Sequence, residues 1–193
     1  MSLQSLIHFR QRIATKLGGA GRLAGLAGDV RGAVVMEFAI CSAAFFALLI
    51  ACAQTVLIFF AQQALQTAAE GGARYIMTGQ ASSDAMTADQ FRAYACGRIP
   101  PIFDCSKLIV DVRSASSFDG IDTGNPTVTY NASGNANNSW QFTSGSAGTI
   151  MIVRVMYLWN TQMGPLNLDF ANAGSGKRLL VGTMVFKSEP YKA

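Results

Sequence analysis

The feature that most constrains this chain is an uninterrupted apolar run of 23 residues from Phe38 to Phe60. The run contains no charged residue, and Gln54 is its only strongly polar side chain. About 20 apolar residues in a helix cross a bilayer. The twelve Leu, Ile, Val and Phe residues of the run favour insertion by roughly 6 kcal/mol. The rest of the chain is too short to bury a helix that is apolar on every face. The sequence therefore predicts one membrane-spanning helix.

The charges on either side of this run predict its orientation. Residues 1–31 carry five Lys or Arg and one Asp, a net charge of +4, whereas residues 61–193 carry ten Lys or Arg and nine Asp or Glu, a net charge of +1. Short basic flanks stay in the cytoplasm. We therefore expect a single-pass membrane protein with a cytoplasmic N-terminus and an exported C-terminal part. The chain has no dense cluster of Lys and Arg, so nucleic-acid binding is not predicted.

The long helix is expected to continue beyond the membrane. Ala, Gln, Leu and Glu dominate residues 61–79; they favour helix, and the apolar residues recur at helical spacing. We expect one helix from about residue 33 to about residue 78, with a bend at Gly71-Gly72. Small residues recur at every fourth position, which would let another helix approach closely, although an alanine-rich helix also yields this spacing by chance. They are Ala39, Ala43, Ala47 and Ala51.

The remaining residues predict a small α+β head. A capping box of Thr87 and Gln90 begins a helix over 87–101 that Pro100-Pro101 would end. Residues 107–114, 149–159 and 178–188 are typical of strands, and 127–130 of a weak one. In the first strand, alternation places Leu108, Val110 and Val112 on one face and Lys107, Asp111 and Arg113 on the other. The expected fold is a long N-terminal helix packed on an antiparallel sheet of three or four strands.

These patterns give four expected segments. A basic leader covers 1–32, the membrane half of the helix 33–60, its exported amphipathic half 61–80, and the head domain 81–193. Residues 115–148 are polar and form a long loop in this interpretation. Within it, Asp119, Asp122 and Asn125 could bind calcium, but they lack EF-hand spacing and turn formation explains them better.

The four cysteines fall into two classes. Cys41 and Cys52 lie in the apolar run, where a thiol behaves as a small hydrophobe. Cys96 and Cys105 lie in the exported part, where an oxidising compartment favours a disulfide. Closing that loop would stabilise the head by roughly 2.5–3 kcal/mol. A metal site is the rival interpretation, but no further Cys and no His follows residue 61.

No catalytic constellation is evident. His8 is the only histidine and lies in the leader, so neither a His-based triad nor a His metal site can form outside. Trp140, Tyr157 and Trp159 are expected to be core or subunit contacts rather than a ligand site. We therefore expect no enzymatic activity, no cofactor and no metal.

The most informative motif is Arg31-Gly32-Ala33-Val34-Val35-Met36-Glu37-Phe38-Ala39, at the start of the apolar helix. A carboxylate near the edge of an apolar span is costly and needs a partner. This segment resembles the TadE-like pseudopilins of the Tad (Flp) pilus machinery, within the type IV pilin class. The resemblance extends through residues 61–75 to the cysteine pair, covering about residues 31–112. Met36 is a mild departure from the commoner small or β-branched residue.

The resemblance implies a pilin-like helix and a specific processing event. A prepilin peptidase would cut between Gly32 and Ala33, making Glu37 the fifth mature residue. The protein would then be a minor pilin or pseudopilin needed for pilus assembly, held in the bacterial inner membrane with its C-terminal domain in the periplasm. Its partners would be the peptidase, other minor pilins, the major pilin, the inner-membrane assembly platform and membrane lipid.

Two alternatives have weaker support. The first is an uncleaved, signal-anchored periplasmic protein with a binding or enzymatic domain. The second is a lipoprotein, since Leu49-Ile50-Ala51-Cys52 has the form of a lipidation signal. The apolar run continues with residues 55–60, whereas a lipoprotein signal gives way to a polar linker after its cysteine.

Overall fold

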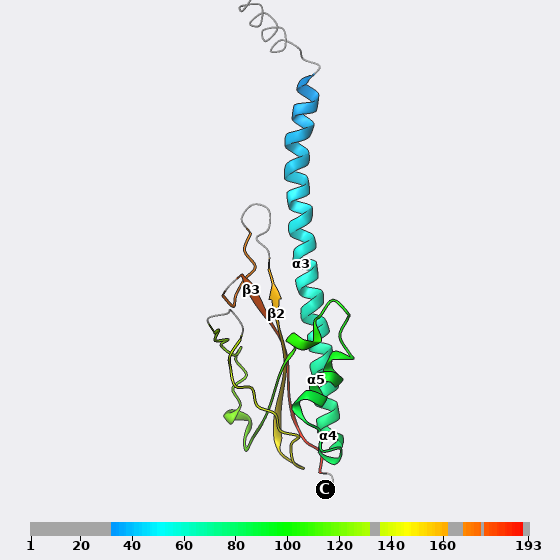
Figure 1. The fold of residues 1–193 in the computed structure, drawn as a ribbon, viewed down its shortest axis with the longest axis vertical. Coiled ribbons are helices and arrows are strands. Elements are labelled where there is room, and N and C mark those ends of the chain that lie inside the picture. The colour runs from blue at the N-terminus through cyan, green and yellow to red at the C-terminus, as the bar shows by residue number, and fades with distance from the viewer. Residues whose placement is uncertain (1–31, 132–135, 162–167, 175, 191–193) are drawn as a thin grey trace, which may run out of the picture. The chain divides into compact units, whose positions relative to one another are not determined.

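A computed structural model describes residues 32–131, 136–161, 168–174 and 176–190. The leader, including His8, lies outside the described residues. A boundary between Leu49 and Ile50 divides the chain into two compact units. The dominant element is α3, a helix over Ala33–Met77 with 45 residues (Figure 1). Its bounds agree with the predicted range of 33 to 78.

After α3, the described residues form one antiparallel sheet with the strand order β1-β2-β3. The strands are β1 (Ile109–Ala115), β2 (Ile150–Asn160) and β3 (Lys177–Lys187). Together with α3 they confirm the predicted α+β fold with three strands. The predicted weak strand over 127–130 is wrong, because this polar segment makes only a single bridge, from Tyr130 to Ala136.

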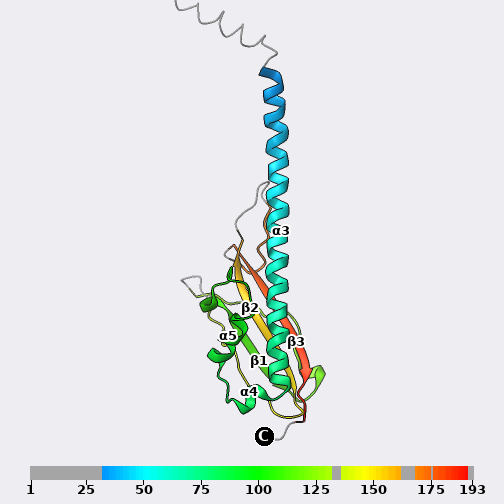
Figure 2. The ribbon, with the colours of Figure 1, turned by 90° about the vertical axis from the view of Figure 1, so that its right-hand side faces the viewer.

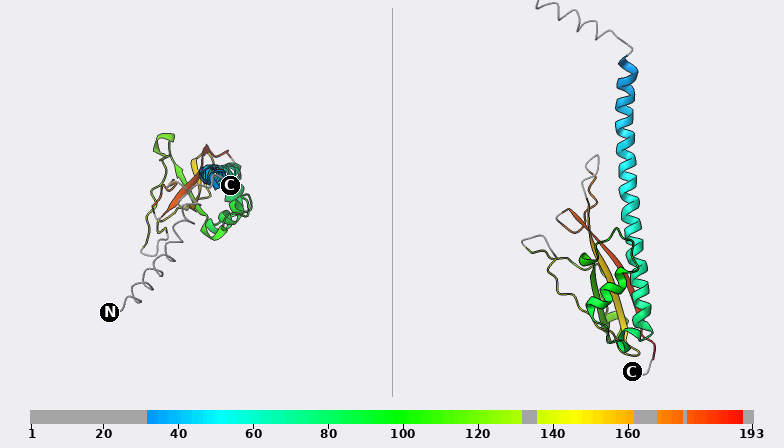
Figure 3. Two further views of the ribbon diagram at one scale, coloured as in Figure 1. Left: turned by 90° about the horizontal axis from the view of Figure 1, so that it is seen from above. Right: turned by 45° about the vertical axis from the view of Figure 1, so that its right-hand side comes forward.

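Short helices fill the connection between α3 and the sheet (Figures 2 and 3). They are α4 (Gln80–Ser83), α5 (Ala88–Cys96) and the 3-10 turn η2 (Cys105–Lys107); a further turn, η3 (Phe118–Gly120), follows β1.

The predicted capping box begins α5. The Thr87 side chain accepts a hydrogen bond from the Gln90 N–H, and the Gln90 side chain accepts one from the Thr87 N–H at 2.8 Å. The predicted end of this helix at Pro100-Pro101 is wrong. The chain leaves the α-helix already at Gly97, whose N–H caps the helix on carbonyls of Ala93 and Ala95, because glycine is a poor helix former.

One face of the sheet packs with α3 into the core. The buried helix residues are mostly small, and the strands contribute alternating β-branched and larger side chains. Gly182 marks the closest approach: a Cβ at this position would collide with the backbone carbonyl of Leu65. The core includes Ala61, Leu65, Ala68, Ala69, Ile76, Val110, Val112, Met151, Val153, Val155 and Leu180.

The glycine pair in α3 serves contact rather than bending. The helix continues through Gly71 and Gly72 to Met77. A Cβ on Gly72 would lie 2.5 Å from the ring of Phe91, which is fully buried. We infer that Gly72 is small because this ring from α5 packs directly on the helix.

Two glutamines of α3 hydrogen-bond to the outer edge of β3. The Gln62 amide donates to the Val181 carbonyl at 2.7 Å and accepts from the Val181 N–H at 3.4 Å. The Gln66 amide does the same with Thr183, at 3.2 and 3.1 Å. Four helical residues rise about 6 Å and two strand residues about 6.6 Å. The two side chains therefore match alternate strand positions and satisfy an edge that would otherwise be open.

Candidate functional site

The predicted processing segment lies at the start of α3. Gly32 immediately precedes the helix and is exposed, and apart from its chain neighbours no described residue places an atom within 4 Å of where its Cβ would be. Glu37 is exposed and follows Ala33 by four residues, which places the two on the same helix face. None of the ion pairs found within the described ranges involves Glu37. The segment thus offers an accessible peptide bond and an acidic side chain one turn beyond it.

The first half of α3 exposes large apolar side chains. Among the residues that the structure describes, α3 is the one helix long and apolar enough to cross a membrane. Its most apolar stretch has a mean hydropathy of 2.4 and is only 11 % buried. The exposed side chains include Val34, Val35, Phe38, Ile40, Phe45, Phe46, Leu48, Val56, Phe59 and Phe60.

The predicted packing stripe lies on this part of the helix. Ala39 and Ala43 are exposed, Ala47 is half-buried and Ala51 is buried. The contacts that the stripe was predicted to make are with other helices. It therefore stays a prediction about contacts between chains.

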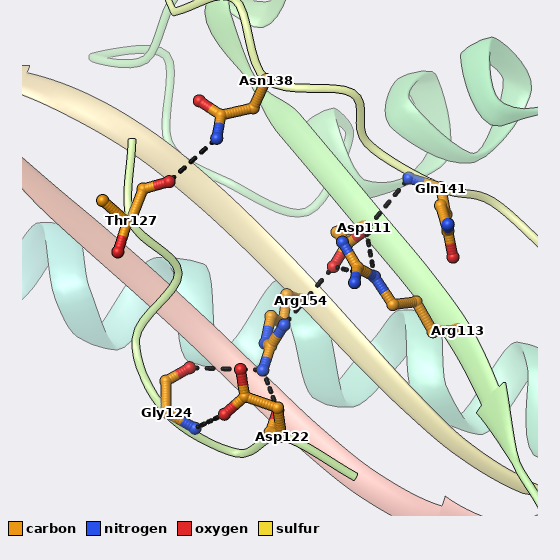
Figure 4. A network of polar contacts seen from close by, with 8 residues as sticks. All are labelled: Asp111, Arg113, Asp122, Gly124, Thr127, Asn138, Gln141 and Arg154. Atoms are coloured by element: carbon orange, nitrogen blue, oxygen red, sulfur yellow. Dashed lines mark hydrogen bonds and ion pairs between the residues drawn. The ribbon is translucent and has the colours of Figure 1, made fainter. Parts of the chain in front are cut away.

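A buried charge pair lies on the face of the sheet away from α3 (Figure 4). Asp111 of β1 lies directly opposite Arg154 of β2 in the register. The two side chains are almost fully buried, and Arg154 Nη1 lies 3.5 Å from the Asp111 carboxylate. Arg113 Nε also contacts this carboxylate, at 2.9 Å. Asp111 lies on the strand face opposite Val110 and Val112, as the alternation predicts, and it is buried there because a later segment of the chain covers this face.

That covering segment follows β1 and is fastened by backbone hydrogen bonds. The Arg154 guanidinium donates to the carbonyls of Asp122 and Gly124, the latter at 3.2 Å. Asp111 accepts from the Gln141 N–H at 3.0 Å. A polar segment with little periodicity thus gains a defined position from two buried charges. An arginine inside an otherwise apolar strand was the signal that could have predicted a buried partner.

The structure gives the acidic loop residues a role in turns. The Asp122 carboxylate accepts from the Gly124 N–H at 2.9 Å, which forms an Asx turn. The backbone carbonyls of Asp122 and Gly124 already bind a guanidinium. Within the described part of the chain, no group of three or more His, Cys, Asp or Glu could hold a metal ion.

A disulfide joins the end of α5 to η2. The structure links Cys96 and Cys105, whose Cα atoms are 5.7 Å apart. Next to it, Asp104 accepts hydrogen bonds from the Ser106 hydroxyl at 2.6 Å and from Lys107 at 2.9 Å. The Ser106 hydrogen bond, followed by that of Lys107, lowers the pKa of Asp104 to about 2. Cys41 and Cys52 are free and exposed on α3.

The aromatic residues singled out in the sequence lie around one end of the sheet. Tyr157 is buried and packs with Phe103, their ring centres 5.1 Å apart. Trp140 and Trp159 are half-buried and line a cavity of about 660 Å³. Two basic residues that border this cavity are paired with neighbouring acids: Lys107 with Asp104, and Arg92 with Asp89. The cavity thus presents aromatic rings, of which Tyr157 and Trp159 lie tilted to each other, and two basic side chains that are each paired with an acid.

The comparisons with known proteins identify one segment. A family model described as TadE-like protein matches residues 32–74. No curated protein and no solved structure matches the chain. The matched segment begins at the glycine before α3 and ends in the last turn of that helix. The resemblance to TadE-like proteins is therefore confirmed over residues 32–74.

Proposed function

We propose that this chain is a minor pilin or pseudopilin needed for assembly of a Tad (Flp) pilus. A prepilin peptidase cleaves it after Gly32, and α3 holds the product in the inner membrane before assembly. The observation that supports this proposal most strongly is a coincidence of boundaries. The TadE-like match, the helix and the accessible Gly32-Ala33 bond all begin within two residues of each other, with Glu37 one turn later.

Glu37 has a specific role in this proposal. Cleavage creates an ammonium group on Ala33, which lies on the same helix face as the Glu37 carboxylate. At the edge of the hydrocarbon, an effective dielectric constant below that of water makes their attraction stronger than that of a surface pair. When Glu37 pairs with the ammonium of a neighbouring subunit, the pair sets the axial register of adjacent helices.

The exposed apolar side chains of α3 suit the subunit both in the membrane before assembly and in the fibre afterwards. Before assembly, lipid covers Phe38, Phe45 and Phe46. In the fibre, helices of neighbouring subunits cover the same residues, so transfer from lipid costs little net burial. Ala39, Ala43, Ala47 and Ala51 provide a surface on which a second helix can approach closely.

The exported head contributes contacts rather than catalysis. Its buried charges, Asp111 and Arg154, are committed to each other and to the segment that covers them. The partners are the prepilin peptidase, other minor pilins, the major pilin and the assembly platform in the inner membrane. The head contacts the other pilins while the helix joins the bundle.

Substitution of Glu37 tests the proposal. Glu37→Gln keeps the shape of the side chain and removes its charge, so we expect normal cleavage and membrane residence but strongly reduced pilus assembly. Glu70→Gln is the matched control, because Glu70 is an exposed acid of α3 beyond the apolar run. Cleavage is measured by the size of the membrane-bound product, and assembly by counting pili. Wild-type numbers of pili with Glu37→Gln would contradict the pairing role.

A further inference from the structure

The last residues of β2, the first residues of β3 and the described segment 168–174 between them form a strand-end region beside the last turns of the apolar run, called the hairpin end below. One hollow between them, of about 180 Å³, is lined by Gln54, Leu57 and Ile58 from α3, and by Trp159 and Phe170 from the hairpin side. A second, of about 260 Å³ and mostly apolar, adds Phe59 from α3, and Arg178 and Leu180 from β3. The hairpin end therefore shares its level along α3 with residues of the predicted membrane span.

The same turns of α3 expose large apolar side chains. The exposed fractions are 65 % for Val56, 51 % for Leu57, 70 % for Phe59 and 51 % for Phe60. These residues continue the exposed apolar surface of the preceding turns. The two polar residues between them, Gln54 and Thr55, are half-buried. An apolar surface that is continuous with a membrane span is expected to contact lipid as well.

Helix geometry places this level at the outer boundary of the hydrocarbon. The 28 residues from Ala33 to Phe60 extend about 42 Å in a helix, close to the 40–45 Å of a bilayer with both headgroup regions. With Glu37 at the inner edge of the hydrocarbon, the roughly 20 residues that span its core of about 30 Å are 38–57. Residues 58–60 then lie in the outer interfacial region, and the strand ends beside residues 54–59 lie at its boundary with the hydrocarbon.

The composition of the hairpin end fits that environment. Trp159 and Phe170 are half-buried, and Leu168 is 39 % exposed. Arg178 lies opposite Trp159 in the register and donates to the Phe170 carbonyl at 3.0 Å, so one of its five donors is used there. Aromatic residues concentrate at membrane interfaces, and basic side chains near the surface interact with anionic lipid.

We propose that the end of this hairpin is a phospholipid-binding site, formed by Trp159, Leu168, Phe170 and Arg178 together with Phe59 of α3. The apolar side chains enter the outer leaflet at the level of the acyl-chain carbonyls, and the Arg178 guanidinium binds a headgroup phosphate. This inference rests on the proposed membrane residence of α3. The site would fix the depth of the subunit in the membrane before assembly, and the hairpin end must leave the lipid when the subunit enters a fibre.

The two tryptophans of the chain provide a matched test. Full-length Trp140→Phe retains only Trp159. Full-length Trp159→Phe retains only Trp140, which borders the 660 Å³ cavity with Trp159 but lines neither of the two hollows beside α3. Each is reconstituted into phosphatidylcholine–phosphatidylglycerol vesicles whose acyl chains carry bromine near the carbonyl end. We expect bromine to quench Trp159 several-fold more strongly than Trp140. Equal weak quenching of both, in protein that floats with the vesicles, would overturn the lipid site alone.

Flotation separates this inference from the proposed function, because a chain that does not float with vesicles would contradict membrane residence itself. The role of Arg178 is tested by Arg178→Gln, with Lys187→Gln at the opposite end of β3 as control. In the protein with Arg178, we expect vesicles that contain phosphatidylglycerol to quench Trp159 more strongly than vesicles of pure phosphatidylcholine. In Arg178→Gln we expect the two kinds of vesicle to quench Trp159 equally. An unchanged effect would remove Arg178 from the site, and circular dichroism shows whether each variant keeps the fold.

Discussion

The two halves of α3 have the same backbone conformation and opposite surfaces. From Ala33 to Ile50 the helix exposes large apolar side chains such as Phe38 and Phe46. From Ala61 to Ile76 its buried positions are mostly alanine and glycine, and its glutamines bind a strand edge. The first surface suits lipid or other helices, whereas the second suits a sheet that approaches to backbone contact. One helix thus carries two different kinds of interface in sequence.

The sheet shows a second contrast between its two faces. Its face toward α3 is apolar, and its other face is held by the buried pair of Asp111 and Arg154. The following predictions test these contrasts through the free energy of unfolding of the domain that contains the sheet. It is measured by urea unfolding of the full chain in micelles, followed by tryptophan fluorescence.

The largest expected effect comes from Asp111→Ala. Removing one partner of a buried pair leaves Arg154 charged and uncompensated, which costs about 3–5 kcal/mol. Asp89→Ala is the control, because it removes an exposed pair with Arg92 and should cost about 0–1 kcal/mol. Equal, small losses from both variants would show that the charge pair does not hold the covering segment.

Two leucines compare the halves of α3 directly. Leu65 is fully buried against the sheet, and Leu48 is 59 % exposed. Leu65→Ala should reduce the free energy of unfolding by about 3 kcal/mol, whereas Leu48→Ala should leave it unchanged. A similar loss from both variants would break the division of α3 into two interfaces.

Gly182→Ala tests the close approach of β3 to the helix. The new methyl group would meet the Leu65 carbonyl, and the backbone must move apart at a cost of about 2 kcal/mol. At Gly97→Ala the new Cβ makes only ordinary contacts, the nearest at 3.6 Å, and φ is −63°, so no loss is expected. If Gly182→Ala has the same urea midpoint of unfolding as the wild-type chain, the helix and strand do not touch at this position.

Gln66→Ala removes both hydrogen bonds to Thr183 at the strand edge. Since each neutral hydrogen bond contributes about 1 kcal/mol net, we expect a loss of about 1–2 kcal/mol. Gln63, an exposed neighbour on α3, is the control. Faster hydrogen exchange of the Thr183 amide in Gln66→Ala, but not in Gln63→Ala, would locate the effect. Unchanged exchange in both would contradict the edge contact.

The smallest effect concerns Asp104 beside the disulfide. Its pKa of about 2 in the folded state lies below the ordinary value of about 3.9. The group therefore contributes stability above pH 4 that is lost as the pH falls through the folded pKa. An NMR titration of the Asp104 carboxyl should show this low pKa, and Ser106→Ala should raise it. Titration of wild-type Asp104 near pH 4 would contradict the hydrogen bonds described.

The elements predicted correctly are those whose signals are local. An unbroken apolar run followed by Ala, Gln and Leu predicts α3, and alternation at Val110 and Val112 predicts β1. The capping box at Thr87 needs only the next three residues.

The features that were missed depend on partners distant in the sequence. Alternation places Asp111 on the face opposite Val110 and Val112, but it does not show that a later segment covers that face. Gly72 lies on the apolar stripe of the helix, but no local pattern shows that its neighbour there is the Phe91 ring of α5. The bonds from Gln62 and Gln66 to β3 join residues 119 and 117 positions apart, and no local pattern indicates them.

The measurement that tests the central claim most directly is the intact mass of the native molecule, purified from cells with an active prepilin peptidase and from cells without it. We predict a chain that begins at Ala33 when the peptidase is active, and a chain that keeps residues 1–32 when it is absent. A molecule that retains its leader in the presence of the enzyme would contradict the assignment of Gly32, Ala33 and Glu37 to pilus assembly.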